Sequence, residues 1–219
     1  MLTDAVYQSL SFPSLPPDQE EKDWHYHMRR SMQEIVPCIY LGPYAAVTKN
    51  KLEVLKEHGI THIVCIRHPI EANLIKPNFP QNFRYLTLDI IDKPTEPILE
   101  FFPMVKEFIE ECLHHKGKVL IHGNGGISRS ASFVIAYIME TYGLSYQKSF
   151  LYVQQKRYCI NPNEGFVRQL QEYEPIYLAR YQQQGQTSSS GIYKRKYEID
   201  DENSDLVKRD YFNTNVSNS

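Results

Sequence analysis

The chain has 219 residues, enough for one ordinary domain with some residues left over for terminal segments. Hydrophobic residues make up 42% and charged residues 23%, a composition typical of soluble globular proteins. The 24 Lys and Arg nearly balance the 26 Asp and Glu, so the net charge of −2 excludes a chain that binds nucleic acid or anionic membranes through overall basicity.

Hydrophobic periodicity and turn signals divide the chain into alternating strands and helices. In chain order they predict a strand at 35–41, a helix at 49–58, strands at 61–66 and 83–90, a helix at 98–115, a strand at 118–122, and helices at 129–142, 145–157 and 162–181. Gly59 and Gly117 are placed to end helices, Asn161 can cap the last helix, and Pro162 suits its first turn. This alternation favours an α/β fold with a central, mostly parallel sheet flanked by helices.

The two terminal segments differ in composition from the region between them. Residues 1–21 contain three prolines and no clear periodicity, so we expect a loose lead-in there. After Tyr181 the chain becomes rich in Gln, Ser and Gly and then carries mixed charges, a composition that cannot bury a core. We therefore predict one domain at 22–182 and a disordered tail at 183–219.

The sequence indicates neither membrane insertion nor secretion. The longest uninterrupted apolar run, residues 133–139, is far shorter than the roughly 20 residues that a membrane span needs. No basic residue precedes Lys22, so we expect no signal peptide. The four cysteines have no metal-ligand spacing, and Cys65 and Cys112 fit buried apolar patterns. They predict reduced structural thiols in an intracellular protein without a bound metal.

The strand, loop and helix at 118–142 carry the most functional information. The loop has three glycines in four positions, which allow the backbone to curl tightly and turn its N–H groups inward. The following helix directs its N-terminal N–H groups to the same point, and Arg129 can bind two phosphate oxygens at once. Ser128 and Ser130 add hydroxyl donors. The segment therefore predicts a binding site for a phosphate dianion.

Two nucleotide-binding motifs fit this loop poorly. When Gly123 is aligned with the first glycine of the P-loop, G-x-x-x-x-G-K-[ST], Ser128 and Arg129 replace the second glycine and the lysine. The dinucleotide fingerprint, G-x-G-x-x-G, fails because Ser128 stands at its third glycine. The loop therefore favours neither class of nucleotide.

The segment instead resembles the phosphate loop of cysteine-dependent protein tyrosine and dual-specificity phosphatases, H-C-x-x-G-x-x-R-[ST]. Every fixed position of that motif matches the stretch from His122 to Ser130, except that Gly123 stands where the family has its catalytic cysteine. Asp92 follows a predicted strand at the place of the family's general acid, and residues 161–166, N-P-N-E-G-F, resemble the family's segment beside the phosphate loop. The resemblance covers nearly all of the predicted domain and implies the dual-specificity phosphatase fold.

The resemblance also implies a role for each residue of the site. The residues implied to bind phosphate are Gly123, Asn124, Gly125, Gly126, Ile127, Ser128 and Arg129. The residues implied to support the loop are His122, Ser130, Asn161 and Asn163. Asp92 would keep the place of the general acid or be an ordinary loop residue, because acid catalysis achieves nothing without a nucleophile. No metal or other cofactor is implied.

The loss of the nucleophile, with Y-L-G-P at 40–43 and A-Y-I-M-E-T at 136–141, gives a further resemblance to a catalytically inactive member of the family, a pseudophosphatase. Active members attack phosphorus with a thiolate, which Gly123 lacks, whereas a backbone cradle and Arg129 do not depend on sulfur. The main hypothesis is that the protein binds phosphorylated Ser/Thr/Tyr proteins without hydrolysing them. Two alternatives stay open: a phosphate-independent scaffold that uses the outer surface of a vestigial fold, and an active phosphatase with an unrecognised nucleophile.

The resemblance to the inactive member implies partners besides phosphoproteins in general. These are MAP kinases of the ERK type and an F-box subunit of a ubiquitin ligase, which the protein would meet in the cytoplasm and nucleus as anchor, protector or competitor. Neither a nucleic acid nor a membrane is implied as a partner. For Arg29 and Arg30 two interpretations stay open: contact with an acidic docking groove on a kinase, or, as we prefer, an exposed charge pair.

Overall fold

The structure, a computed structural model, describes residues 12–17 and 23–189, with side chains described up to Gln183. Its centre is one five-stranded sheet with the strand order β1-β2-β5-β3-β4. The strands are β1 (Gln33–Val36), β2 (Ile39–Pro43), β3 (Ile60–Arg67), β4 (Arg84–Asp89) and β5 (Lys118–Gly123). Only the β1–β2 pair is antiparallel, so the predicted α/β class with a mostly parallel sheet is confirmed.

The strand predicted at 35–41 is in fact a hairpin, and that prediction was wrong. Strands β1 and β2 are joined by a tight turn at Cys38, whose φ of 72° lies in the left-handed region. The Cys38 N–H donates to the Glu34 carboxylate at 2.9 Å, and the Cys38 carbonyl accepts from the Val119 N–H at 2.9 Å. The run I-V-P-C-I-Y-L is apolar throughout, so its hydrophobic pattern hides the turn.

The helices follow the predicted order. Five α-helices are present in the described chain: α2 (Leu52–Glu57), α3 (Phe102–His114), α4 (Arg129–Tyr142), α5 (Tyr146–Lys156) and α6 (Glu164–Ser189). Short 3-10 helices form η1 (Tyr26–Arg30), η2 (Tyr44–Ala46), η3 (Lys49–Lys51), η4 (Pro69–Glu71) and η5 (Leu99–Phe101). Gly59 follows α2 with a φ of 73° and ends it as predicted.

Both ends of α6 differ from the prediction. The helix begins at Glu164 because the side chain of Asn163, and not that of Asn161, accepts a hydrogen bond from the Phe166 N–H, at 3.0 Å. It runs to Ser189, beyond the predicted end at Tyr181. The predicted start of a disordered tail at 183 therefore lies within this helix, whereas residues 190–219 lie outside the described chain.

The predicted lead-in at 1–21 is described only in part. Residues 12–17 contain no helix or strand. Phe12 nevertheless packs against the core and lies 4.6 Å from the Tyr181 ring, measured between ring centroids. Residues 1–11 and 18–21 lie outside the described residues, so the boundary at 22 stays a prediction.

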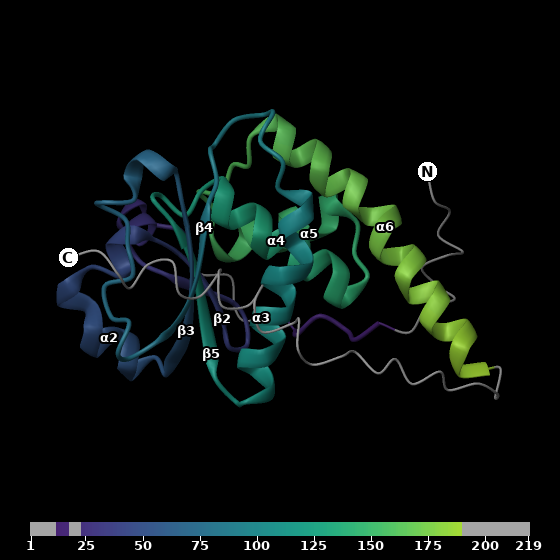
Figure 1. The fold of residues 1–219 in the computed structure, drawn as a ribbon, viewed down its shortest axis with the longest axis horizontal. Coiled ribbons are helices and arrows are strands. Elements are labelled where there is room, and N and C mark those ends of the chain that lie inside the picture. The colour runs from purple at the N-terminus through teal and green to yellow at the C-terminus, as the bar shows by residue number, and fades with distance from the viewer. Residues whose placement is uncertain (1–11, 18–22, 190–219) are drawn as a thin grey trace, which may run out of the picture. The chain divides into compact units, whose positions relative to one another are not determined.

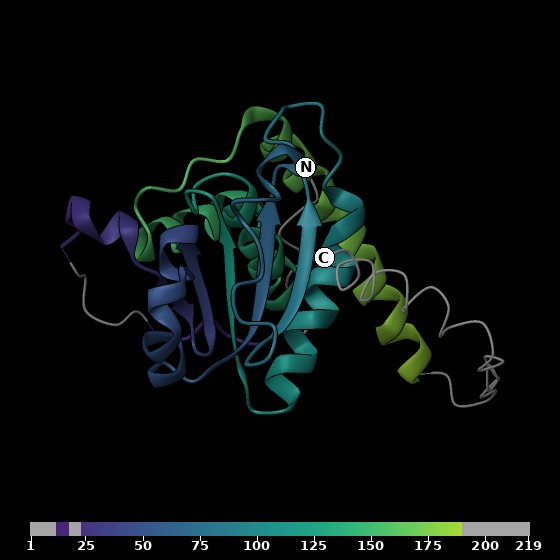
Figure 2. The ribbon, with the colours of Figure 1, turned by 60° about the vertical axis from the view of Figure 1, so that its left-hand side comes forward.

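The helices cover the two faces of the sheet unequally, as Figures 1 and 2 show. Helix α2 lies on one face, and α3, α4, α5 and α6 lie on the other. Alternation along β3 separates two cores: Ile63 packs in the smaller core on the α2 face, and Val64 packs in the larger core under α4. Twelve consecutive residues of α4, from Arg129 to Glu140, are buried. The loop before α4 is therefore held between a central strand and a central helix.

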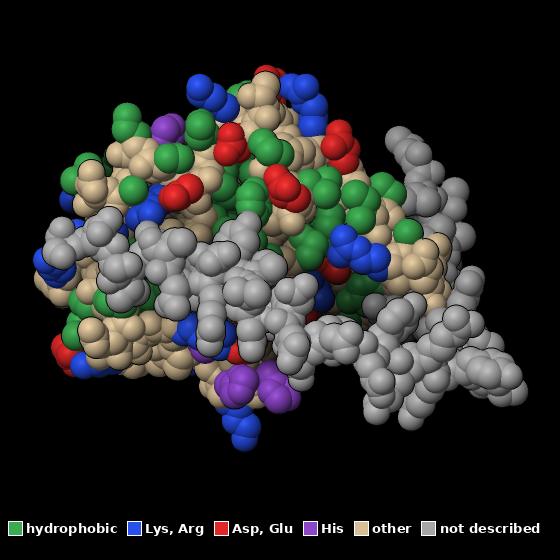
Figure 3. Space-filling view, in the orientation of Figure 1, with side chains coloured by type: hydrophobic (Ala, Val, Ile, Leu, Met, Phe, Trp, Pro, Cys, Tyr) green, Lys and Arg blue, Asp and Glu red, His purple; other side chains and the backbone are tan. Residues whose placement is uncertain are grey.

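The face of the molecule drawn in Figure 3 shows no large patch of charged side chains of one sign. Figure 3 shows Lys and Arg side chains interspersed with Asp and Glu over this face of the molecule. Among the helices that the structure describes, none combines the length and the apolar character that crossing a membrane would require. Cys65 and Cys112 are buried, as predicted.

Candidate functional site

The predicted phosphate loop joins the end of β5 at Gly123 to the start of α4 at Arg129. It therefore lies at the carboxyl end of a central parallel strand, where open α/β sheets place their ligands. Gly126 has a φ of 64°, and a Cβ atom there would lie 2.4 Å from the Gly42 carbonyl oxygen. Only glycine fits this position, so the close approach of loop and β2 explains one of the three glycines.

The loop turns its carbonyl groups toward the protein. The carbonyls of Asn124 and Ile127 accept hydrogen bonds from backbone N–H groups, at 3.0 Å and 2.8 Å, and those of Gly125 and Gly126 accept from a buried arginine. By contrast, the N–H groups of residues 124–128 donate to no acceptor in the part of the chain that the structure describes. The loop therefore offers a row of unused donors to a ligand, as an anion-binding loop must.

The buried arginine is Arg157, which follows α5 and was not predicted as a site residue. Its guanidinium donates to the Gly126 carbonyl at 2.8 Å and to the Gly125 carbonyl at 3.0 Å. It also donates to the carbonyls of Arg29, at 3.1 Å, and Ser31, at 2.9 Å, and to the Gln33 side chain. Arg157 is fully buried and thus ties the loop to the N-terminal segment.

A cavity of about 390 Å³ opens at the loop. The residues that line it are Arg29, Asp92, Gly123, Asn124, Gly125, Gly126, Ile127, Ser128, Arg129 and Ser130. The structure thus brings Asp92 and the whole predicted loop to one cavity, although 31 positions separate Asp92 from Gly123. Arg29 is a lining residue that we did not predict. No cysteine lines the cavity in the described chain.

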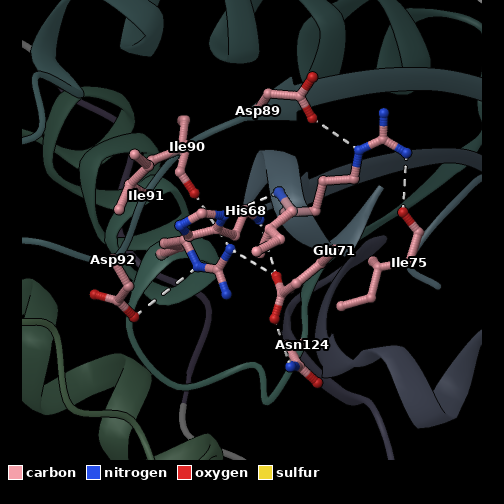
Figure 4. A network of polar contacts seen from close by, with 12 residues as sticks. His68, Glu71, Ile75, Asp89, Ile90, Ile91, Asp92 and Asn124 are labelled. Carbon is pink, nitrogen blue, oxygen red and sulfur yellow. Dashed lines mark hydrogen bonds and ion pairs between the residues drawn. The ribbon is translucent and has the colours of Figure 1, made fainter. Parts of the chain in front are cut away.

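Arg129 is already engaged by a carboxylate in the structure. Its guanidinium donates to Glu71 at 3.1 Å and to the Ile90 carbonyl at 3.2 Å, and its Nε lies 3.9 Å from an Asp92 oxygen. The other Glu71 oxygen accepts from the Asn124 amide at 2.7 Å. Figure 4 shows the Glu71 carboxylate pointing toward Asn124. Glu71 thus fixes both an arginine and a loop residue, and no local signal in the sequence had indicated it.

The charge of Glu71 is stabilised by this arrangement. Burial by itself raises the pKa of Glu71. The hydrogen bonds from the His68 N–H and the Asn124 amide, together with the charge of Arg129, outweigh burial and lower that pKa below its usual value. The carboxylate therefore stays ionised beside Arg129, and an incoming phosphate dianion shares the arginine with it.

Asp92 is held at the rim of the cavity by two donors. Its Oδ1 atom accepts hydrogen bonds from the Ser128 hydroxyl and the Asn163 amide, both at 2.7 Å. The Ser128 hydroxyl in turn accepts from the Asn163 N–H at 3.2 Å. Asp92 therefore lies in the cavity wall, and Asn163 links it to the loop and caps α6. Asn161 is placed differently: its backbone N–H, not its side chain, donates to the Ile127 carbonyl.

The floor of the cavity contains an unused hydroxyl beneath Gly123. The Ser130 Oγ atom is buried and has no hydrogen-bond partner among the described residues. A Cβ atom at Gly123 would lie 3.4 Å from it and 3.3 Å from the Ile66 carbonyl oxygen. Gly123 itself does not have a positive φ, so its backbone is compatible with a side chain.

His122 lies behind the loop and does not line the cavity. It is fully buried, its Nδ1 lies 3.4 Å from the Gly123 carbonyl oxygen, and its Nε2 has no partner among the described residues. Burial lowers the pKa of His122 from 6.5 to about 4, and the contact with Gly123 offsets this only in part. The imidazole is therefore neutral at pH 7 and supports the loop by packing.

We expect acid to destabilise the protein through His122. Between pH 6.5 and 4 the unfolded chain binds a proton at this residue and the folded chain does not, so the free energy of unfolding falls as the pH falls. At pH 5 this loss amounts to about 2 kcal/mol. Urea unfolding at pH 7 and pH 5 should show a smaller loss for His122→Asn than for wild type. Equal losses would contradict the buried neutral imidazole.

Comparison with known proteins agrees with this geometry. Residues 39–176 match the family described as dual specificity phosphatase, catalytic domain. The human serine/threonine/tyrosine-interacting protein is 65% identical over 172 residues, which cover 78% of this chain and 77% of that protein. The serine/threonine/tyrosine-interacting protein A of Xenopus laevis is 66% identical over 172 residues, which cover 78% of this chain and 77% of that protein.

Solved structures give the same similarity. The crystal structure of the human tyrosine phosphatase-like serine/threonine/tyrosine-interacting protein matches with 67% identity and a TM-score of 0.67, covering 68% of this chain and 99% of that one. The structure of DUSP15 matches with 30% identity and a TM-score of 0.62, covering 74% of this chain and 99% of that one. The fold of this chain is thus similar both to that of a tyrosine phosphatase-like protein and to that of DUSP15, as the sequence had indicated.

Proposed function

The chain belongs to the dual-specificity phosphatase family, and on this premise we propose that it binds phosphorylated Ser, Thr or Tyr side chains of partner proteins without hydrolysing them. One observation carries the proposal. The unused N–H groups of residues 124–128 and the Arg129 guanidinium surround a cavity in which Gly123 stands where the family has its nucleophile. Such a site keeps the groups that bind a phosphate but lacks the nucleophile that would cleave it.

The absence of turnover follows from the groups around Gly123. The Ser130 hydroxyl has no base as partner in the described chain, and a hydroxyl without an adjacent base is a weak nucleophile. The Ser128 hydroxyl is held in the cavity wall, where it donates to the Asp92 carboxylate and accepts from the Asn163 N–H. Burial raises the pKa of the Cys65 thiol to about 12, so this cysteine is not a thiolate at neutral pH. Ser130 and Cys65 therefore give no support to an active phosphatase with another nucleophile.

Binding does not require sulfur. Hydrogen bonds to a charged group contribute about 1.5–3 kcal/mol each, so a few of them give a dissociation constant of about 1 μM. A glycine also removes the repulsion that a thiolate would exert on an incoming dianion. Glu71 competes with the phosphate for Arg129, which lowers the affinity for phosphate. The unused backbone donors offset this loss.

We extend the proposal to cellular partners through the relatives. The names of the curated relatives describe proteins that interact with serine, threonine and tyrosine, and the resemblance of the sequence to an inactive member implies ERK-type MAP kinases and an F-box subunit of a ubiquitin ligase. The protein would act on them as anchor, protector or competitor in cytoplasm and nucleus. Capture of these partners with the Arg129→Ala protein as control tests this extension.

Arg129→Ala is expected to weaken phosphopeptide binding by about 10- to 100-fold, because it removes one or two charge-assisted hydrogen bonds. Isothermal titration with a phosphotyrosine peptide and its unphosphorylated form measures this. Circular dichroism verifies folding, since Arg129 is buried. The exposed Arg168 on α6, paired with Glu164, provides the matched control Arg168→Ala. Equal affinity for both peptides, or no effect of Arg129→Ala, would instead favour the phosphate-independent scaffold.

A further inference from the structure

Arg29 is the cavity residue to which the family resemblance gives no role in the site. It lies on η1, more than 90 positions before the loop, and its side chain is exposed. Among the lining residues it and Arg129 are the two cations. The neighbouring Arg30 is also exposed but does not line the cavity. The position of Arg29 therefore differs from that of an ordinary surface arginine.

The Arg29 guanidinium has no acidic partner within 4.0 Å among the described residues. By contrast, Arg67 pairs with Asp89 and Arg129 pairs with Glu71. The exposed Arg168 also has a carboxylate nearby, whereas the exposed Arg30 has none among the described residues and differs from Arg29 in not lining the cavity. The charge of Arg29 is thus available to a ligand that enters the cavity.

A second positive charge lies close to Arg29. Arg157 is buried and donates only to carbonyl and amide oxygens, so no carboxylate neutralises it in the described chain. Burial lowers the pKa of Arg157, Cys159 nearby raises it, and the charge of Arg29 makes a smaller contribution that lowers it. Two neighbouring guanidinium groups without a counter-ion repel each other, and an anion bound between loop and η1 would relieve this repulsion.

The backbone of Arg29 is fixed to the phosphate loop. A single guanidinium nitrogen of Arg157, Nη2, donates both to the Arg29 carbonyl, at 3.1 Å, and to the Gly125 carbonyl, at 3.0 Å. The two acidic residues at the site contact the loop elsewhere: Glu71 at Asn124, and Asp92 at Ser128. Among the lining residues, Arg29 thus makes the part of the rim near η1 positive, and Asp92 places a carboxylate near Ser128.

We propose that Arg29 is a specificity-determining residue that binds an acidic side chain next to the phosphorylated residue of the partner. The preferred ligand is then a phosphopeptide with Asp or Glu beside the phosphoresidue. This inference rests on the proposed phosphate site and adds a second subsite to it. Acidic residues near Asp92 would be repelled, so the peptide is also oriented by its charge.

Two synthetic phosphotyrosine peptides of equal length test the subsite, one with Glu and one with Gln on both sides of the phosphotyrosine. Isothermal titration with wild type should show about fivefold or greater preference for the Glu peptide at low salt. Arg29→Gln should lose this preference, and Arg30→Gln, the matched control, should keep it. The preference should shrink as ionic strength rises.

The outcomes distinguish the subsite from the site on which it rests. Equal affinity of wild type for the two peptides would overturn the subsite and leave the phosphate site in place. Loss of the preference in Arg30→Gln as well as in Arg29→Gln would overturn it too, because diffuse surface charge would then explain the preference. Binding of neither peptide would overturn the proposed function and the subsite together.

Discussion

Replacing Gly123 with cysteine is expected to turn the protein into a phosphatase that hydrolyses a generic aryl phosphate, whereas the wild type is expected to show no measurable rate. The remaining parts of the reaction are present around the cavity: unused backbone donors, Arg129 and the Asp92 carboxyl group. The new thiolate would attack phosphorus, Asp92 would give its proton to the leaving oxygen, and water would then hydrolyse the cysteinyl phosphate.

The position of Gly123 can accept this side chain. Its φ is not positive, and a Cβ atom would meet its nearest neighbours, the Ile66 carbonyl oxygen and the Ser130 Oγ, at 3.3 Å and 3.4 Å. These contacts are tight and require shifts of only a few tenths of an ångström. The free Ser130 hydroxyl can donate to the sulfur, and the loop donors would lower the thiol pKa into the range of about 3.5–7.5.

Matched variants separate chemistry from folding. Gly123→Ser has the same shape without a thiol and should stay inactive, and adding Asp92→Asn to Gly123→Cys should lower the rate by about 100-fold or more. Steady-state release of the aryl alcohol at several pH values measures all three proteins. A folded but inert Gly123→Cys protein would show that the loop no longer has a productive geometry.

The sequence predicted the parts of the site that are continuous in the chain. The strand, glycine-rich loop and helix at 118–142 are local patterns with fixed spacing, so they were predicted nearly to the residue. Asp92 was predicted only through the family resemblance. It is far from the loop in the chain, and no hydrophobic period or local motif connects the two. The structure brings it to the loop because β4 and β5 are both parallel to β3.

The residues that the sequence did not reveal act across long separations. Arg157 contacts Arg29 across 128 positions, and Glu71 contacts Arg129 across 58. Such contacts depend on how segments pack, and neither composition nor periodicity records them. The missed hairpin at Cys38 has a different cause, since an apolar run satisfies a strand pattern whether or not it turns.

These long-range contacts suggest how the phosphate loop keeps its shape without a bound ligand. Its unused N–H groups face no protein acceptor in the described structure, so the opposite side of the backbone must hold it. Two of its carbonyls are bound by Arg157, and two by the backbone of η2 and of the segment before α6. A preorganised loop loses little conformational freedom when an anion binds, which favours affinity.

Arg157→Met is therefore expected to destabilise the protein by about 3 kcal/mol or more and to weaken phosphopeptide binding as well. The substitution leaves the buried carbonyl of Gly126 without a donor and removes the donor from the partly buried carbonyls of Gly125, Arg29 and Ser31. A buried unsatisfied group costs about 1–3 kcal/mol, and the partly buried groups add smaller losses. Removing the cost of burying a charge offsets part of this loss. In a domain of this size the midpoint of thermal unfolding should fall by about 6–12 °C.

The matched control is Arg168→Met, which removes an arginine that is 65% exposed and whose partner Glu164 is 74% exposed. Such a pair contributes less than about 1 kcal/mol, so its midpoint should stay close to that of wild type. Thermal and urea unfolding followed by circular dichroism compare the three proteins, and titration with the Glu-flanked phosphopeptide compares their binding. If the Arg157→Met protein has the same unfolding midpoint as wild type, the hydrogen bonds of Arg157 do not stabilise the loop. If it is destabilised but binds with full affinity, the loop would instead be ordered by the glycines and α4 alone, and Arg29 would be positioned without Arg157.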